Sequence, residues 1–316
     1  MQERADLKVV ALGGGHGLAA TLTALRSITN QITAVVTVAD NGGSSGRLRE
    51  EFPILPPGDL RMALAALCGD DSWGRDWAEI MQYRFTSDGE LNGHALGNLL
   101  LAALWDRDED VVLGLDRVGA LLKVVGRVLP MSAEPLDIEA SFLHDGQRLE
   151  AKGQVAVATT PGRLHELRLT PENPPVRPEV LAAIEEADWI TMGPGSWFSS
   201  VLPHLLVPSL RDAITNSRAK KVLLLNLDAQ AGLTGEYAGY SPREHYEILL
   251  RYAPDLHFDL VIGDSHLPGG GELSSYLSSL DSSYFEADLR DSAVTIHHDQ
   301  RKLASAFAHI AEKMLV

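Results

Sequence analysis

The chain has 316 residues, of which 45% are hydrophobic and 22% are charged, a balance that is ordinary for a soluble globular protein. Its 43 acidic and 27 basic side chains give a net charge of −16, which argues against nucleic acid and anionic membranes as partners. The single cysteine, Cys68, excludes an intrachain disulfide and fits the cytoplasm, while a signal peptide and a membrane-spanning apolar run are not recognisable.

The first part of the chain alternates between strand and helix patterns. Residues 7–12 and 32–39 are apolar runs typical of buried parallel strands, and residues 18–27 between them predict a helix. This order of strand, loop, helix and strand is the first half of a Rossmann-like unit. Two further helices are expected, one over residues 59–67, which Asp59 could cap, and one over residues 94–104.

The pattern changes at about residue 132. Residues 136–142 and 149–157 alternate around a turn at 144–147 and predict a β-hairpin, to which residues 165–169 could add a strand. The α/β alternation then resumes, with strands at 189–192, 222–227, 260–262 and 294–296 and helices at 179–187, 242–252 and 302–315. We therefore expect a single Rossmann-like α/β domain over residues 1–316, with a mostly parallel sheet and a β-rich insertion at about 132–170.

A glycine-rich loop follows each of the first two strands. The first loop contains Gly13, Gly14, Gly15, His16 and Gly17, and the second contains Asp40, Asn41, Gly42, Gly43, Ser44, Ser45 and Arg47. Glycine lets successive backbone N–H groups turn inward into a nest that suits an anion, and serine and arginine add donors for phosphate. Two such loops on neighbouring strand ends predict a phosphorylated ligand at the edge of the sheet. For the first loop, a tight turn without a ligand is the alternative.

The first loop departs from the dinucleotide-binding fingerprint, because Leu18 stands where the third glycine is expected. Asp40, at the end of the second strand, could bind a sugar or nucleoside hydroxyl, hold a magnesium ion, or cap a turn. Arg47 could grip a diphosphate, although an exposed arginine is usually a solvated charge.

Three further segments carry polar side chains. Gly193, Pro194, Gly195 and Ser196 follow a strand, where a helix N-terminus would suit a phosphate, and Asn226 ends another strand and could hydrogen-bond a base or a sugar. His94 and Asn98 share one face of a predicted helix, either as ligand contacts or as a hydrogen-bonded core pair. No catalytic triad, activated cysteine or metal-binding His/Cys cluster is recognisable, so we assign no catalytic residue.

Six motifs along the chain together resemble one family. They are GGGHGL, VTVADNGGSSGRLR, PPGDLR, LNGHALGNLLLAAL, GPGSWFSSVLPHLLVP and IHHDQRKLA. Their combination and order are similar to those of the gluconeogenesis factor (YvcK-like) family, which is related to 2-phospho-L-lactate transferase (CofD-like). The resemblance implies a Rossmann-like three-layer αβα fold, a cytoplasmic location, and binding of UDP-sugars, notably UDP-N-acetylglucosamine. It also implies a role in cell shape and wall synthesis during growth on gluconeogenic carbon.

The resemblance also implies a set of site residues. The glycine loops, Asp40, Asn41, Asp59, His94, Asn98 and residues 193–196 would line the ligand cleft. Three departures from the family pattern stand out: His16 replaces a small residue, Asn41 replaces the second acid of a frequent Asp-Asp pair, and residues 227–242 differ from the usual segment after Asn226. The change at Asn41 weakens the expectation of magnesium binding.

These observations favour a regulatory factor that binds a small nucleotide sugar. The alternative is a CofD-like transferase that moves a phospholactyl group from a nucleoside-diphosphate-linked donor to a deazaflavin, with Asp40 and Asp59 holding magnesium. An NAD(P) oxidoreductase is a third and weaker reading, because the third glycine is missing. Homo-oligomers and protein partners in cell-wall synthesis or regulation are left open by the sequence.

Overall fold

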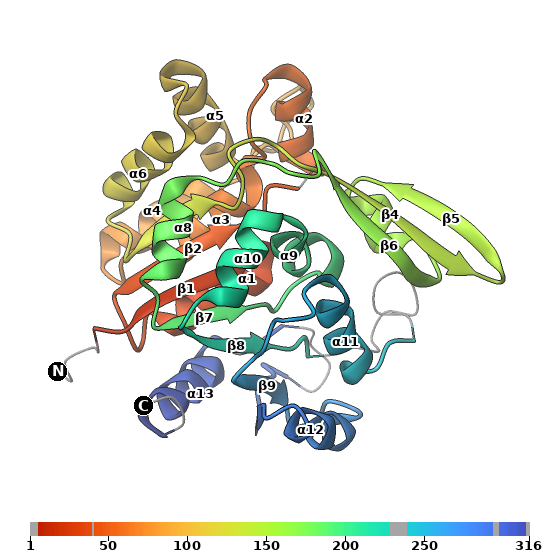
Figure 1. Cartoon of the computed structure of the whole chain (residues 1–316). Coiled ribbons are helices and arrows are strands. Elements are labelled where there is room, and N and C mark those ends of the chain that lie inside the picture. The colour runs from red at the N-terminus through yellow and green to blue at the C-terminus, as the bar shows by residue number, and fades with distance from the viewer. Residues whose placement is uncertain (1–5, 40, 228–238, 293–296, 314–316) are drawn as a thin grey trace.

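A computed structural model describes residues 6–39, 41–227, 239–292 and 297–313. Its centre is a sheet of seven parallel strands in the order β10-β9-β8-β7-β1-β2-β3 (Figure 1). The strands are β1 (Lys8–Gly13), β2 (Gln31–Val36), β3 (Arg127–Pro130), β7 (Trp189–Met192), β8 (Lys220–Leu224), β9 (Leu260–Asp264) and β10 (Ser283–Ala287). Nearly every residue of β1, β7, β8 and β9 is buried, as expected for strands covered on both faces. The expected α/β fold with a mostly parallel sheet is confirmed.

The direction in which strands are added to the sheet reverses beside β1. The chain first builds outward from β1 through β2 to β3, and it then returns to place β7 on the other side of β1. The carboxyl ends of β1 and β7 are level, because Leu12 pairs with Met192. In open α/β sheets, ligands bind in the crevice outside such a reversal point. The topology therefore places a crevice between the loops that leave β1 and β7.

Helices cover the sheet. On one face α1 (Gly15–Leu25) packs against α3 (Pro57–Ala66) and α13 (Gln300–Lys313), while α10 (Pro208–Asn216) packs against α8 (Pro178–Glu185) and α9 (Pro203–Leu206) over the other (Figure 1). Outside the β-rich insertion, the other helices of the described ranges are α2 (Gly43–Glu51), α4 (Ser72–Gln82), α5 (Leu96–Asp108), α6 (Val111–Leu122), α11 (Pro242–Tyr252), α12 (Gly270–Ser278) and the π-helix η1 (Trp197–Val201). None of the helices in the described ranges is long and apolar enough to pass through a bilayer.

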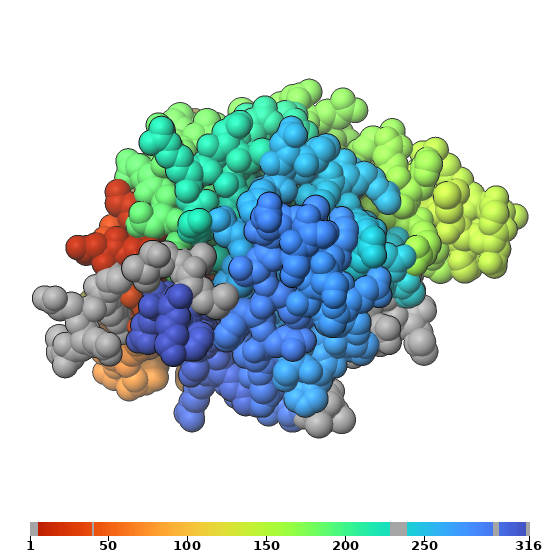
Figure 2. Space-filling view, turned by 60° about the horizontal axis from the view of Figure 1, so that its bottom comes forward, coloured from red at the N-terminus to blue at the C-terminus, as the bar shows by residue number. Residues whose placement is uncertain are grey.

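The β-rich insertion is present as a separate three-stranded antiparallel sheet that projects from the body of the molecule (Figure 2). It consists of β4 (Asp137–His144), β5 (Gln147–Lys152) and β6 (Arg163–Thr170), in the order β5-β4-β6. Asp145 and Gly146 both have positive φ, as a two-residue hairpin turn requires. The expected hairpin is confirmed, but its second strand ends at Lys152, and a short helix, α7 (Gln154–Thr159), follows.

Some local expectations differ from the structure. Helix α3 begins at Pro57, so Asp59 lies in its first turn and does not cap it. Helix α5 begins at Leu96 rather than at His94, because Arg84 and Ala95 form a β-bridge that holds the preceding segment extended. Strand β10 was not expected, since it is a half-exposed edge strand without a clear apolar run. The strand expected at 294–296 lies outside the described residues.

Because His204 is buried, we expect the free energy of unfolding to decrease at acid pH. Burial lowers its pKa from 6.5 to about 4, so the folded chain keeps this ring neutral while the unfolded chain can bind a proton. Its contribution to stability is complete above pH 6.5 and is lost as the pH falls toward 4. We expect His204→Gln, which can still donate to the Val35 carbonyl, to reduce the loss of unfolding free energy over this range by about 3 kcal/mol.

Urea unfolding at a series of pH values measures this effect. Parallel stability curves for the wild type and the variant would show that His204 does not carry the acid sensitivity.

Candidate functional site

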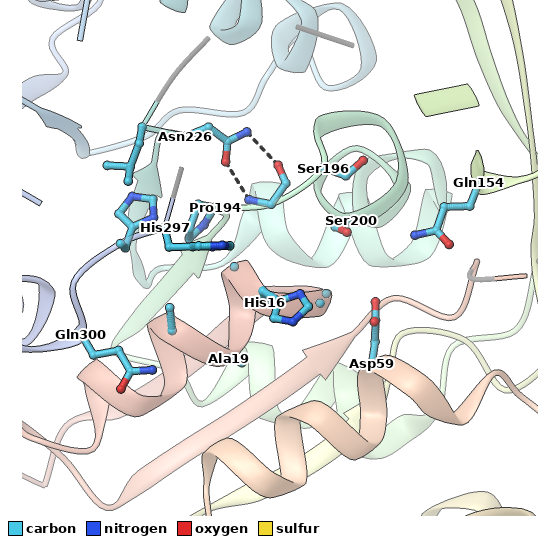
Figure 3. Close-up of a pocket in the computed structure, with 17 residues that line it drawn as sticks. His16, Ala19, Asp59, Gln154, Pro194, Ser196, Ser200, Asn226, His297 and Gln300 are labelled. Carbon is cyan, nitrogen blue, oxygen red and sulfur yellow. Dashed lines mark hydrogen bonds between the residues drawn. The ribbon is translucent and has the colours of Figure 1, made fainter. Parts of the chain in front are cut away.

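A cavity of about 710 Å³ lies at the reversal point, between the carboxyl ends of β1 and β7 (Figure 3). Its walls come from the first glycine loop and α1, from α3, from α7, from the loop after β7, from the end of β8 and from the start of α13. The lining residues are Gly14, Gly15, His16, Gly17, Ala19, Ala20, Asp59, Gln154, Pro194, Gly195, Ser196, Ser200, Asn226, Leu227, His297, His298 and Gln300.

Two glycines let neighbouring walls approach the start of α1. A Cβ atom on Gly17 would lie 2.3 Å from the carbonyl oxygen of Pro194, and one on Gly14 would lie 2.5 Å from Oδ2 of Asp59. Both distances are too short for real contacts, so a side chain at either position would displace its neighbour. The absence of these side chains brings Asp59 and the loop after β7 against the N-terminus of α1.

The loop after β7 is held by the end of β8. The Asn226 side chain accepts a hydrogen bond from the Gly195 N–H at 2.9 Å and donates one to the Gly195 carbonyl at 2.8 Å (Figure 3). Ser196 then caps the π-helix η1 and accepts from the backbone N–H of Ser199 at 3.2 Å and from its hydroxyl at 2.6 Å. These bonds fix the positions of Ser196 and Ser200 along the cavity wall.

The wall opposite α7 contributes imidazole groups. His16 and His297 face each other with their ring centroids 6.4 Å apart, and His298 lies next to them in the chain. Burial lowers the pKa of His298 to about 4, against a hydrogen bond to the Leu225 backbone, so its ring is neutral at physiological pH. Nε2 of His298 is buried and has no partner in the described part of the chain. With Nδ1 bonded to a carbonyl, Nε2 is left as an acceptor.

The insertion reaches the site through Gln154. This residue begins α7, and its backbone N–H donates to Oδ1 of Asn41 at 3.1 Å. Asn41 itself does not line the cavity; it ties the second glycine loop to the insertion, next to Gly153. Figure 3 shows the Gln154 and Asp59 side chains on the same side of the cavity.

Nine of the residues proposed from the sequence line the cavity. They are Gly14, Gly15, His16, Gly17, Asp59, Pro194, Gly195, Ser196 and Asn226. Gly13 and Gly193 adjoin this set at the ends of β1 and β7. Asp40 lies outside the described residues, so its proposed role stays a prediction.

The serines of α2 and the pair His94 and Asn98 meet away from the cavity lining. The Ser44 hydroxyl lies 2.9 Å from Nδ1 of His94 and accepts from Nδ2 of Asn98 at 3.0 Å, and all three side chains are buried. The Ser45 hydroxyl accepts from the backbone N–H of Gly58 at 3.0 Å. This arrangement matches the core alternative for His94 and Asn98. Gly42 and Gly43 stand at the start of the same helix.

Arg47 also has an internal role. Its guanidinium donates to the carbonyl oxygens of Glu90 at 3.1 Å and Asn92 at 2.7 Å. It thereby holds the loop between α4 and α5, and it is not among the cavity residues.

Several lining residues were not proposed from the sequence. They are Ala19, Ala20, Gln154, Ser200, Leu227, His297, His298 and Gln300. The tail motif IHHDQ contains three of them, so its two adjacent histidines were the available signal. Gln154 and Ser200 had no such signal, because only the tertiary fold brings α7 and η1 to the cavity.

One group of carboxylate and imidazole side chains could hold a metal ion. Within the described ranges, His, Cys, Asp and Glu converge in threes only at Asp264, His266 and Asp288. Asp264 already binds the Arg290 guanidinium at 2.7 Å and the Leu289 N–H at 2.8 Å, so its charge is satisfied. At the cavity, Asp59 is the only carboxylate among the described lining residues. One carboxylate together with ligand phosphates is a common way of holding Mg²⁺.

Close packing at Gly17 generates a stability prediction. We expect Gly17→Ala to lower the free energy of unfolding by about 1–3 kcal/mol, because the new methyl group meets the Pro194 carbonyl. The control is Gly271→Ala in α12, where a Cβ meets nothing within 4 Å. That change should be neutral or stabilise by up to about 1 kcal/mol. Urea unfolding measures both, and equal effects would contradict the close approach.

Comparisons with known proteins agree on one family. The family model described as 2-phospho-L-lactate transferase CofD matches residues 9–314. A Mycobacterium tuberculosis protein named "Putative gluconeogenesis factor" is 47% identical over 309 residues, which are 94% of this chain and 88% of that protein. A Listeria monocytogenes protein named "Gluconeogenesis factor" is 37% identical over 249 residues, covering 79% of this chain and 74% of that one.

A solved structure has the same fold. The crystal structure of a UPF0052 family protein from Bacillus halodurans superimposes with a TM-score of 0.82 at 31% identity. The match covers 96% of this chain and 99% of that chain. The Mycobacterium relative and the Bacillus structure therefore match this chain over nearly its whole length.

Proposed function

The chain belongs to the CofD family and, from that premise, we propose that it is a gluconeogenesis factor that acts by binding a nucleotide sugar of the UDP-N-acetylglucosamine kind. In the cell this protein would support cell shape and growth on gluconeogenic carbon sources. The observation that carries the proposal is that one cavity combines donors for an anion with acceptors for hydroxyl groups.

The donors for an anion lie at the N-terminus of α1 and on the wall that faces it. The first N–H groups of a helix have no partner within the helix and attract anions, and here the first such helical bond is that of Leu18 to Gly14. Ser196 and Ser200 line the facing wall. A diphosphate placed there would bind backbone N–H groups and hydroxyls, which is a local solution for a chain whose net charge of −16 repels anions.

Acceptors at both ends of the cavity recognise a different kind of group. The Asp59 carboxylate and Nε2 of His298 accept hydrogen bonds, and the Gln154 side chain can donate and accept. Sugar and ribose hydroxyls and the imide N–H of uracil are donors that fit these atoms. A cavity of 710 Å³ is in the range that small-molecule ligands occupy. These properties together support a nucleotide sugar over a simple phosphate ester.

Calorimetric titration with UDP-N-acetylglucosamine tests the proposal. We expect the wild type to bind and Asn226→Ala to lose at least about tenfold in affinity, because the Gly195 loop loses two hydrogen bonds. Asn216→Ala is the control, since Asn216 is exposed on α10 and bonds only the Asp212 carbonyl of its own helix.

If the folded wild-type chain gives no heat of binding at millimolar ligand, nucleotide-sugar binding is rejected. In a bacterium that lacks its own gluconeogenesis factor, the wild-type chain but not Asn226→Ala should restore growth on gluconeogenic carbon.

A CofD-like transferase reaction is the second candidate, and the family match over residues 9–314 favours it. Asp59, with Asp40 as a predicted partner, would hold a magnesium ion that neutralises charge on the donor diphosphate. The Asp59 carboxylate stands beside the N-terminus of α1, where it would otherwise repel a phosphate.

Incubation with a deazaflavin, a nucleoside-diphosphate-linked phospholactate donor and magnesium tests this candidate. Product that disappears in Asp59→Asn would establish transfer. We expect no product, but we expect magnesium to strengthen nucleotide-sugar binding in the wild type and not in Asp59→Asn. An affinity that is insensitive to magnesium in both proteins would contradict the role of Asp59.

A further inference from the structure

Arg61 is a buried cation without a hydrogen-bond partner at two of its nitrogens. The residue is 3% exposed, and Nε and Nη1 are both buried and unpaired within the described ranges. An unpaired buried charge is costly, and buried polar groups are almost always bonded to protein, water or an ion. The donors of Arg61 therefore point to a group that the protein chain does not itself supply.

The Arg61 side chain lies against the N-terminus of α5. Its Cγ atom would be 2.8 Å from a Cβ on Gly97, the second residue of that helix. A helix N-terminus carries a partial positive charge, so an arginine next to it is in an unfavourable field. Because α5 is a helix of 13 residues, its dipole is fully developed there. Both features favour an anion at this place.

Other charged groups lie close by, and two of them are cations. Burial chiefly, and then the charge of Arg84, lower the pKa of Arg61 to about 10, while Asp59 acts in the other direction. Burial and then the charges of Arg47 and Arg84 lower the pKa of His94 as well. Arg47 and Arg84 are exposed and donate to main-chain carbonyls of the loop between α4 and α5, so they add positive charge near Arg61.

A neighbouring amide is also unsatisfied. Oδ1 of Asn98, which follows Gly97 in the chain, is buried without a partner, while its Nδ2 donates to Ser44. Turning the amide over would let oxygen accept from the Ser44 hydroxyl and would present N–H donors where Oδ1 now lies. Asn98 can thus adapt to an anion at the start of α5.

The backbone N–H groups of Leu96, Asn98 and Leu99 already donate to main-chain carbonyls, so the first turn of α5 contributes its positive field rather than a set of donors. We propose that the side chain of Arg61 binds one small oxyanion, a phosphate or a carboxylate, beside this turn. The place lies where α3 and α5 pack together beside α2 (Figure 1). It is separate from the nucleotide-sugar cavity, because Asp59 lines that cavity and Arg61 does not. Guanidinium groups recognise both kinds of oxyanion through paired N–H donors. The inference does not depend on the proposed function.

Thermal unfolding of the full chain in inorganic phosphate, in acetate and in chloride, at equal ionic strength, tests the proposal. An anion that binds only the folded chain raises its unfolding midpoint with the logarithm of concentration. We expect a rise in phosphate or in acetate over chloride for the wild type. A rise in phosphate alone indicates a tetrahedral oxyanion, and a rise in both indicates that carboxylates bind too.

Arg61→Met should show a smaller rise than the wild type, because only phosphate bound at the cavity would then contribute. In chloride it should be at least as stable as the wild type, because it removes an unpaired buried charge. Arg117→Met is the control: its side chain is 44% exposed and pairs with Asp108, so the rise should persist at its full size. Arg61→Lys keeps the charge but lacks the paired N–H donors of a guanidinium, so it should also show a smaller rise than the wild type. This variant provides the test if Arg61→Met does not fold.

Equal wild-type midpoints in all three salts, or a rise as large in both Arg61 variants as in the wild type, would overturn the proposal. Titration of Arg61→Met with the nucleotide sugar is an independent measurement, because it reports binding at the cavity alone. It therefore distinguishes a wrong assignment of the Arg61 site from a wrong assignment of the cavity.

Discussion

The site depends on the reversal of strand order beside β1. Because β2 and β7 flank β1 on opposite sides, the chain segments that leave β1 and β7 turn to opposite faces of the sheet. A gap then opens between α1 and η1, while the strand ends beneath it stay level. Any parallel sheet with this order has such a crevice. What distinguishes this chain is how closely the two walls approach, which depends on the missing side chains of Gly14 and Gly17.

The approach of the two walls requires internal hydrogen bonds that a ligand does not supply. Asn226 holds the Gly195 backbone from one side, and the Thr21 hydroxyl donates to the Gly193 carbonyl at 3.3 Å from the other. The Thr37 hydroxyl donates to the Ser199 carbonyl at 3.2 Å, so β2 also supports η1. These contacts fix the cavity wall before a ligand arrives, which reduces the ordering cost of binding.

The sequence predicted the parts of this site that are local. Glycines directly after a buried strand, and GPGS after another, indicated loops at a sheet edge, and the sheet then aligned them. It could not predict Gln154 or Ser200, because their positions depend on how the insertion and η1 pack. The spacing of His94 and Asn98 suggested one helix face. The bridge between Arg84 and Ala95 instead makes His94 precede the helix, and both side chains meet Ser44. Helical periodicity alone cannot show such a bridge.

The distribution of charge links the two anion-binding proposals. A chain with a net charge of −16 repels anions at long range, so affinity must come from donors that act within a few ångströms. At the cavity these donors are backbone N–H groups and hydroxyls, which carry no formal charge and need little desolvation. At Arg61 the donor is a full charge that is already buried in the folded chain, so binding an anion requires little further desolvation of the guanidinium. An anion there would gain both the Coulomb attraction and the hydrogen bonds that the fold leaves unmade, which makes a buried arginine a selective site even in an acidic protein.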